Sequence, residues 1–343
     1  MKRSGDHAIL VIKSTKKKTV ADMDDQLIWN ALLPLFEDFN GPHTFPQKRP
    51  LLAHYTSIAT LERIMATNEV WFSNPLFMND VEELRFGMMQ GFQKFSSDSR
   101  ISEACGSKER ASKLIQSFNF YFESFSNEHA LDVYVFCLSE HDGQNTDGLL
   151  SMWRGYGGNG NGAAIVFDTG KINVSPASPL IFSRVEYSSA AERIEALDKV
   201  LDNFSRLLKA ANLPDDKLQF AAWLLLDRLK MFALFTKDRG FGEEQEWRIA
   251  YFKDRDTRKS LEPMCHYAIG DRGLEPKLKL KVAPIEGVTA DDLSLSKLIH
   301  QIILGPTVSH PLAKSTVLRM LEKVGKPELK ERVSASRIPF RAT

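Results

Sequence analysis

The chain has 343 residues, of which 43% are hydrophobic and 26% are charged, as in an ordinary soluble globular protein of one large domain or two modest ones. Its formal net charge of +1 argues against a broad nucleic-acid-binding surface. The three cysteines, Cys105, Cys137 and Cys265, lie far apart and form no Cys-x-x-Cys pair, which argues against a disulfide framework and a thiolate zinc site.

We expect no signal peptide at the beginning of the given sequence. Residues 1–30 carry charges throughout and contain no long apolar run, and the most apolar later run, Phe220–Leu226, is followed directly by charged residues. We therefore expect a cytoplasmic protein that makes no contact with a membrane. The first element that the pattern predicts is a helix over Met23–Phe39, which Gly41-Pro42 closes.

Two short strands, each followed by the start of a helix, come next. Leu51–Thr56 has the pattern of a strand, and its last residue or Ser57 is placed to cap the helix after it. Val70–Phe72 indicates a second strand, and Asn79-Asp80 opens another helix. His54 lies near the end of a strand that leads into a helix, where polar side chains often face a ligand. A hydrogen-bonded structural histidine is the plainer interpretation.

The most apolar strand that the pattern predicts is Val133–Leu138, whose near-continuous hydrophobic run is typical of a strand buried on both faces. An amphipathic helix over Ser107–Phe125 precedes it. The strand ends in four polar residues, Ser139–Asp142, which are typical of the edge of a pocket. We interpret the glycine-rich segment Gly157–Gly162 as a turn before the strand Ala163–Asp168, because it has neither a P-loop ending nor the strand-to-helix position of a dinucleotide fingerprint.

Two helices then lead to the stretch around which we predict the site. A capping box, Ser189–Glu192, starts the first helix, and the second runs from about Pro214 to Thr236. From Glu246 onward the side chains alternate as in a half-buried strand, with Glu246 and Arg248 on one side and Trp247 on the other. If the Trp247 side faces the core, the two charged side chains together face a cleft or solvent.

The end of the chain is predicted to add two strands, Lys277–Val282 and Leu298–Leu304, and a closing helix, Ala313–Val324. These elements predict an α+β fold in which helices flank a central mixed or antiparallel sheet. We divide the chain into an N-terminal arm and helix, residues 1–45, and a single α+β domain, residues 46–343.

Several motifs occur in an order that resembles the bacterial domain-of-unknown-function family 2971, over about residues 51–255. The motifs are His54-Tyr55-Thr56, Trp71 to Asp80 with Glu83, Phe136 to Glu140, Met152 to Tyr156, Gly162 to Asp168 and Glu244 to Arg248. Members of that family are largely uncharacterised, so this resemblance by itself implies little chemistry.

The chain is also similar to the ADP-ribosyltransferase superfamily with its His-Tyr-Glu type of site. A strand carrying His-x-Thr enters a helix, a later strand ends in an aliphatic-Ser pair, and a last strand opens with Glu-x-Glu. This resemblance implies an ADP-ribosyltransferase-like fold and an enzyme that cleaves the nicotinamide–ribose bond of NAD, its substrate. ADP-ribose would pass to a protein or a nucleic acid, in the setting of a toxin or a phage-defence effector that a regulatory partner controls.

The same resemblance implies roles for particular side chains. Glu246 would be the catalytic glutamate, and Glu244 would help the incoming nucleophile. The first-strand pair would hold the ribose and the amide, and one of two aromatic rings near residue 155 would stack on nicotinamide. The NAD-binding side chains are then His54, Thr56, Ser139, Tyr156, Trp153 and Arg248. We expect His54, Ser139 and Glu246 to converge on one cleft, with the serine supporting the glutamate.

The residue types suit this chemistry. Breaking the nicotinamide–ribose bond builds positive charge on the sugar, and a fixed carboxylate stabilises that transition state more than the ground state, with no metal required. Two other classes stay open. One is a metal-dependent hydrolase or nuclease with the ligands His54, Asp80, Glu83, His141, Asp142 and Glu246, although no metal-binding spacing is present. The other is a non-catalytic binding module whose pocket is formed by Trp71, Trp153, Tyr156 and Trp247.

Overall fold

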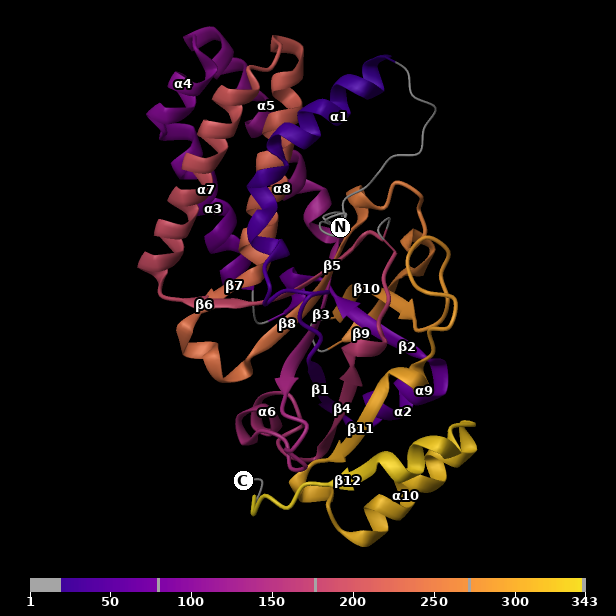
Figure 1. The fold of residues 1–343 in the computed structure, drawn as a ribbon. Helices are drawn as coiled ribbons and strands as arrows, with labels where there is room; N and C mark the ends of the chain where they lie inside the picture. The colour runs from indigo at the N-terminus through magenta and orange to yellow at the C-terminus, as the bar shows by residue number, and fades with distance from the viewer. Residues whose placement is uncertain (1–19, 79–80, 176–177, 271–272, 341–343) are drawn as a thin grey trace, which may run out of the picture.

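The structure is a computed structural model that describes residues 20–78, 81–175, 178–270 and 273–340. A sheet runs through the middle of the molecule, a bundle of helices lies at one end, and a single helix lies at the opposite end near the C-terminus (Figure 1). The predicted α+β class, with helices flanking a central mixed sheet, is confirmed.

The main sheet is built from strands that come from most of the chain length. They are β1 (Leu51–Ser57), β2 (Glu69–Ser73), β3 (Val133–His141), β4 (Gly162–Asp168), β5 (Leu180–Arg184), β8 (Glu246–Phe252), β9 (Cys265–Gly270), β10 (Gly273–Lys281), β11 (Ile299–Leu304) and β12 (Val333–Ala335). Their order is β12-β11-β4-β1-β3-β2-β10-β9, and β8 pairs with both β3 and β5. The β11–β12 pair is parallel, and its neighbours are antiparallel, which makes the sheet mixed.

The central strand is β3, as its apolar run predicts. One of its edges pairs with β8 from Val133 to Ser139. The other edge pairs with β1 near its end, and with β2 at Val135. β1 and β2 pair with different parts of this edge. The strands beside β3 therefore hold the sequence motifs of β1, β2 and β8 next to one another.

A helical layer covers one face of β3 and β8. Its members are α1 (Val20–Leu32), α3 (Val81–Ser97), α4 (Ser99–Cys105), α5 (Lys108–Asn127), α7 (Ala190–Ala211) and α8 (Leu218–Phe235). Nearly every residue of α8 is buried, because α3, α5 and the sheet pack around it. Val135 of β3 and Ala250 of β8 belong to the same apolar core as these helices, so the helices close that face of the sheet to water.

Shorter helices cover the other parts of the sheet. They are α2 (Ile58–Thr67), α6 (Leu150–Gly155), α9 (Leu295–Leu298) and α10 (Pro311–Lys323). Apolar side chains of α2, α9 and α10 join Phe136 and Trp247 in a second core on the opposite face of β3 and β8. A small parallel pair, β6 (Glu186–Ser188) with β7 (Thr236–Asp238), joins the helical layer to the start of β8. Within the described ranges, no helix is long and apolar enough to cross a membrane.

Most of the predicted elements are confirmed, with the caps that the sequence indicates. Ser57 caps α2, and Ser189 with Glu192 forms the capping box of α7. The helix predicted over Met23–Phe39 is shorter than expected: α1 ends at Leu32, and the 3-10 helix Leu33–Asn40 follows. Pro34 explains the change, because proline has no amide hydrogen and its ring clashes with the preceding turn. The predicted helix start Asn79-Asp80 lies outside the described residues.

Candidate functional site

The sheet itself divides the predicted site into two faces. Residues directly opposite each other in an antiparallel pair have their side chains on the same face. Ala53 pairs with Ser139, and Ser139 pairs with Glu246, so these three define what we call the Glu246 face. Neighbours along a strand point to opposite faces. His54 therefore points to the other side, which we call the Trp247 face.

His54 is held on the Trp247 face by one ring contact and one hydrogen bond. Its ring centroid lies 4.6 Å from that of Phe136. Its Nδ1 lies 3.1 Å from the carbonyl oxygen of Cys137, which accepts a hydrogen bond, so Nδ1 carries the proton of the neutral ring. Burial lowers the pKa of His54 to about 4, although this hydrogen bond acts in the opposite direction. The imidazole is therefore neutral at pH 7.

The prediction that His54, Ser139 and Glu246 converge on one cleft is wrong. Strand alternation places the backbone of β3 between the imidazole and the carboxylate, because the strand pairing fixes Ala53, and not His54, opposite Ser139. Thr56 lies two residues beyond His54 and therefore shares its face, where it is buried. The two implied holders of the ribose and the amide thus lie on the other side of the sheet from the implied catalytic glutamate.

On the Glu246 face, two carboxylates converge on one ammonium group. Lys237 Nζ lies 2.7 Å from Glu244 Oε2 and 3.5 Å from Glu246 Oε2. The Arg248 guanidinium donates to both oxygens of Glu246, at 2.8 and 2.9 Å. The hydroxyl of Tyr156 donates to Glu244 Oε1 at 2.7 Å. We call these five side chains the Glu–Lys cluster.

Most of this cluster is enclosed. Lys237, Glu246 and Arg248 are buried, and Arg248 also donates to the carbonyl of Leu234 in α8 at 2.7 Å. The expectation that Glu246 and Arg248 face a cleft or solvent is therefore wrong, because the helical layer covers their side of β8. Burial alone would raise the pKa of Glu246, but Arg248 and Lys237 outweigh that effect and lower it. The Glu246 carboxylate is therefore ionised at neutral pH.

The cluster reaches the surface at Glu244 and Tyr156. The side chain of Glu244 is 14% exposed, and Tyr156 is 43% exposed. A second exposed ring, Phe241, lies with its centroid 4.6 Å from Lys237 Nζ. A ligand that arrives from solvent would therefore meet a fixed carboxylate beside aromatic rings, which suits a sugar joined to a flat heterocycle.

The chain reverses sharply to bring Glu244 to this position. Glu244 ends the 3-10 helix Arg239–Glu244, and the next residue, Gln245, has a φ of 43° in the left-handed region that residues with side chains seldom adopt. Ser139 Oγ donates to the backbone carbonyl of Glu244 at 2.7 Å. Ser139 therefore holds the backbone of this turn, whereas the resemblance implied that it supports the carboxylate of Glu246.

The two tryptophans nearest to the predicted site in the sequence, Trp153 and Trp247, are fully buried. Trp153 packs edge-on against Tyr55 with a centroid distance of 4.8 Å, and its Nε1 donates to the carbonyl of Asp147. Its prediction as the stacking ring is therefore wrong, and Tyr156 is the candidate that has an exposed face. Trp247 lies on the opposite face of the sheet. The prediction that four aromatic side chains form the pocket of a binding module is therefore wrong as well.

The ligand set of the metal interpretation does not assemble among the described residues. In the ranges that the structure describes, no group of three or more His, Cys, Asp or Glu side chains is arranged to hold a metal ion. His54 and Glu246, two members of the predicted set, lie on opposite faces of the sheet. Asp80 and the side chain of Glu83 lie outside the described residues.

Lys237 is the residue of the cluster that sequence reasoning missed. It follows a buried helix, and no spacing relates it to the two glutamates. The pairing of β7 with β6 places it beneath them, because Lys237 lies opposite Tyr187, whose hydroxyl accepts from the backbone amide of Glu246 at 2.9 Å. The available signal in the sequence was a lysine between a helix and a strand. That signal is weak.

One of the comparisons with known proteins finds a family that is similar to part of this region. No curated protein and no solved structure matches the chain. The segment from residue 152 to residue 249 contains Tyr156, Lys237 and the Glu-x-Glu stretch that leads into β8. That segment, residues 152–249, matches the profile of a family described as a protein of unknown function, DUF2971, and this part of the chain is similar to that family.

Proposed function

We propose that the chain is an NAD-dependent enzyme that cleaves the nicotinamide–ribose bond and transfers ADP-ribose to a macromolecular acceptor. One observation carries this proposal: Glu244 and Glu246 converge on Lys237, beside the exposed ring of Tyr156. The Glu-x-Glu stretch that leads into β8, which resembles that of the ADP-ribosyltransferase superfamily, supports the same reaction.

In this proposal Glu244 is the carboxylate that touches substrate, because it is the more exposed of the two. When nicotinamide leaves with the electron pair of the glycosidic bond, positive charge develops on the ribose. A carboxylate already fixed by Tyr156 and Lys237 stabilises that charge without reorganising. Glu244 then takes the proton of the hydroxyl or amine that attacks the ribose carbon.

The remaining side chains of the cluster position Glu244. Arg248 keeps Glu246 ionised, and Glu246 in turn attracts Lys237, which orients Glu244. The Tyr156 ring is assigned to stack on nicotinamide. His54 and Thr56 have no part in this version of the site, because they lie on the Trp247 face.

The test measures free nicotinamide released from NAD by the purified chain, with a cell lysate as the source of acceptors. Glu244→Gln removes the charge and keeps the shape of the side chain, and we expect it to lower the rate about a hundredfold or more. The exposed neighbour Glu243 offers a matched control, and Glu243→Gln should leave the rate unchanged. Glu243→Gln should keep the wild-type melting temperature, whereas Glu244→Gln should lower it, because it leaves the buried Lys237 with Glu246 at 3.5 Å. Both variants are therefore assayed well below the melting temperature of Glu244→Gln.

Two results would contradict the proposal. One is wild-type protein that releases no nicotinamide and whose melting temperature does not respond to NAD. The other is release that persists equally in Glu244→Gln and Glu243→Gln, which would place the chemistry elsewhere or in a contaminant.

A further inference from the structure

The segment Ser336–Phe340 follows β12 and packs against α6, the helix that leads to Tyr156 (Figure 1). It also contacts the turn after that helix, Gly157–Gly162, which we call the glycine turn. The first, third and fifth side chains of the segment are buried or half-buried, and the two between them are exposed. The segment therefore presents one face to the rest of the protein.

Two backbone hydrogen bonds anchor the start of this segment. The amide of Ser336 donates to the carbonyl of Leu304 at 2.8 Å, which continues the pairing of β12 with β11. The amide of Arg337 donates to Oδ1 of Asp147 at 2.6 Å. The backbone carbonyl of Asp147 in turn accepts from Nε1 of Trp153 at 2.9 Å. Asp147 therefore joins the segment to the buried tryptophan of α6.

Two side chains of the segment pack on α6 and on the glycine turn. Ile338 packs against the small apolar core that contains Trp153. The ring centroid of Phe340 lies 5.5 Å from the guanidinium carbon of Arg154 in α6. The same ring lies directly on the backbone of Gly160, because a Cβ atom added there would come within 2.8 Å of the ring. Phe340 therefore contacts both the helix and the turn.

The helix α6 depends on such contacts for its position. It has 6 residues, and its N-cap residue, Leu149, provides no side-chain hydrogen bond. A helix of this length is not stable by itself, so tertiary packing must hold it. Tyr156 is its C-cap residue, and the Tyr156 hydroxyl donates to Glu244 at 2.7 Å. The place of this exposed ring beside Glu244 therefore depends on what holds α6.

We infer that the Ser336–Phe340 segment positions Tyr156 against Glu244 by holding α6 and the glycine turn in place. Its inward side chains contact the chain on both sides of Tyr156, in α6 before it and in the glycine turn after it. Displacement of the segment would therefore free Tyr156 to move away from Glu244. The role of the segment in substrate binding rests on the proposed function, in which the Tyr156 ring stacks on nicotinamide, whereas its hold on α6 does not.

Hydrogen exchange of the full chain tests the hold on α6 without NAD. The amides of Tyr156 and Gly157 both donate to the carbonyl of Met152, so their exchange reports the opening of α6. We expect Phe340→Ala to speed the exchange of these two amides about tenfold or more and to leave the amides of α7 unchanged. Arg337→Ala is the matched control, because its side chain is 81% exposed and its backbone donor is kept.

Three results of this measurement would overturn the inference. The first is unchanged exchange of the two reporting amides in Phe340→Ala. The second is an equal change in Arg337→Ala, and the third is an equal rise in the exchange of α7, which would mean a general loss of stability. Phe340→Tyr keeps the ring, and we expect its exchange to stay close to that of the wild type.

Nicotinamide release from NAD tests whether the segment acts through Tyr156. We expect Phe340→Ala to lower kcat/KM about tenfold or more, because the ring is no longer held in place, and Phe340→Tyr to retain most of the activity. In a Tyr156→Ala background, Phe340→Ala should cause no further loss, because the ring that the segment positions is already absent. An equal further loss in that background would overturn the inference.

The two measurements separate this inference from the proposed function. If the wild type releases no nicotinamide, the proposed function fails, and the exchange of the Tyr156 and Gly157 amides alone decides whether the segment holds α6. If Phe340→Ala loses nicotinamide release but keeps wild-type exchange of these amides, the inference fails and the proposed function stands.

Discussion

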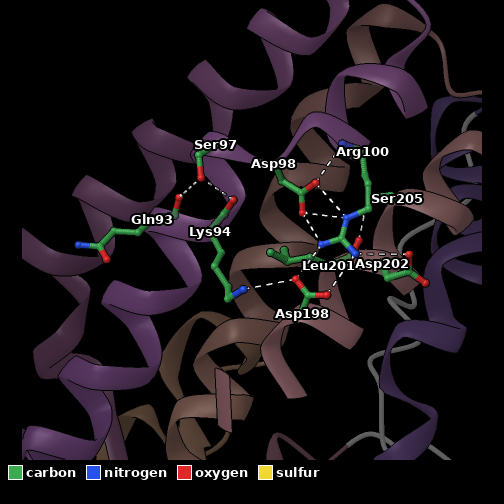
Figure 2. A network of polar contacts seen from close by, with 9 residues as sticks. All are labelled: Gln93, Lys94, Ser97, Asp98, Arg100, Asp198, Leu201, Asp202 and Ser205. Atoms are coloured by element: carbon green, nitrogen blue, oxygen red, sulfur yellow. Dashed lines mark hydrogen bonds and ion pairs between the residues drawn. The ribbon is translucent and has the colours of Figure 1, made fainter. Parts of the chain in front are cut away.

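Two polar networks of this protein have similar connections and very different surroundings. The first joins α3, α4 and α7 through Lys94, Asp98, Arg100, Asp198 and Asp202 (Figure 2). Arg100 stands at its centre and lies 2.6 Å from Asp98 and 3.0 Å from Asp198. The Asp198 side chain is 48% exposed, so water reaches the ion pairs.

The second network is the Glu–Lys cluster under the helical layer. Its distances are much the same, since Arg248 lies 2.8 Å from Glu246 and Lys237 lies 2.7 Å from Glu244. Its central members are buried, so water is excluded. Exposed pairs are screened and contribute little, whereas a buried charge that loses its partner is strongly destabilising. The comparison indicates that the burial of a network, and not its number of contacts, decides how much the network contributes to the free energy of unfolding.

The largest effect should follow from removing the cation beside Glu246. We expect Arg248→Met to lower the free energy of unfolding by about 3 to 5 kcal/mol, because among the described side chains it leaves the buried Glu246 with one cation, Lys237, at 3.5 Å. Urea denaturation at pH 7 measures this change. Arg100→Met, the matching change in the exposed network, should cost at most about 1 kcal/mol. Equal losses of unfolding free energy for the two variants would show that burial does not distinguish the two networks.

A smaller effect should follow from the buried imidazole on the opposite face of the sheet. The pKa of His54 is about 4 in the folded chain and 6.5 for an imidazole in water, so the unfolded chain binds more protons between these values. The stability that depends on the neutral His54 ring is therefore fully present above the pKa of the unfolded chain, 6.5, and is lost as the pH falls towards 4. The free energy of unfolding should fall by about 2 kcal/mol between pH 7 and pH 5 through His54 alone.

His54→Gln isolates this contribution, because glutamine does not titrate and can still donate to the carbonyl of Cys137. Unfolding free energies of wild type and variant at several pH values give the difference. The two curves should converge as the pH is lowered. Parallel curves would mean that the imidazole is not withdrawn from water.

The smallest effect should come from the exposed network. Asp198→Asn removes the carboxylate shared by Lys94 and Arg100, and we expect a loss of at most about 1 kcal/mol. The loss should shrink as salt is added, because exposed charges are screened. Urea denaturation at low and at high salt checks both statements. A large loss that does not depend on salt would show that this network behaves like the buried one.

Local patterns in the sequence predicted the elements well. The apolar run Val133–Leu138 specified the central strand, and Ser189 with Glu192 specified the start of α7, because a buried strand and a capping box each depend on a few neighbouring residues. The end of α1 was missed although Pro34 signals it, so that error came from the interpretation and not from the sequence.

The candidate site was predicted less well because it depends on register. A shift of one residue in strand pairing moves every side chain of a strand to the other face. The residues of β1 do not indicate which residues of β3 they pair with. The pairing of Ala53 with Ser139 put His54 on the Trp247 face. The exposed ring of Tyr156 was one of two aromatic candidates that the sequence could not separate, and burial of Trp153 separated them.

By itself the sequence determined the alternation of β8, the Glu-x-Glu stretch at its start and the helices that lead to it, because these follow from residue types at short separations. Tertiary structure alone decided that a helical layer buries Glu246 and Arg248, and that Lys237 lies beneath two glutamates. The physical reason is the same in each case. The energy of a charge depends on its surroundings, and those surroundings are formed by residues far away along the chain.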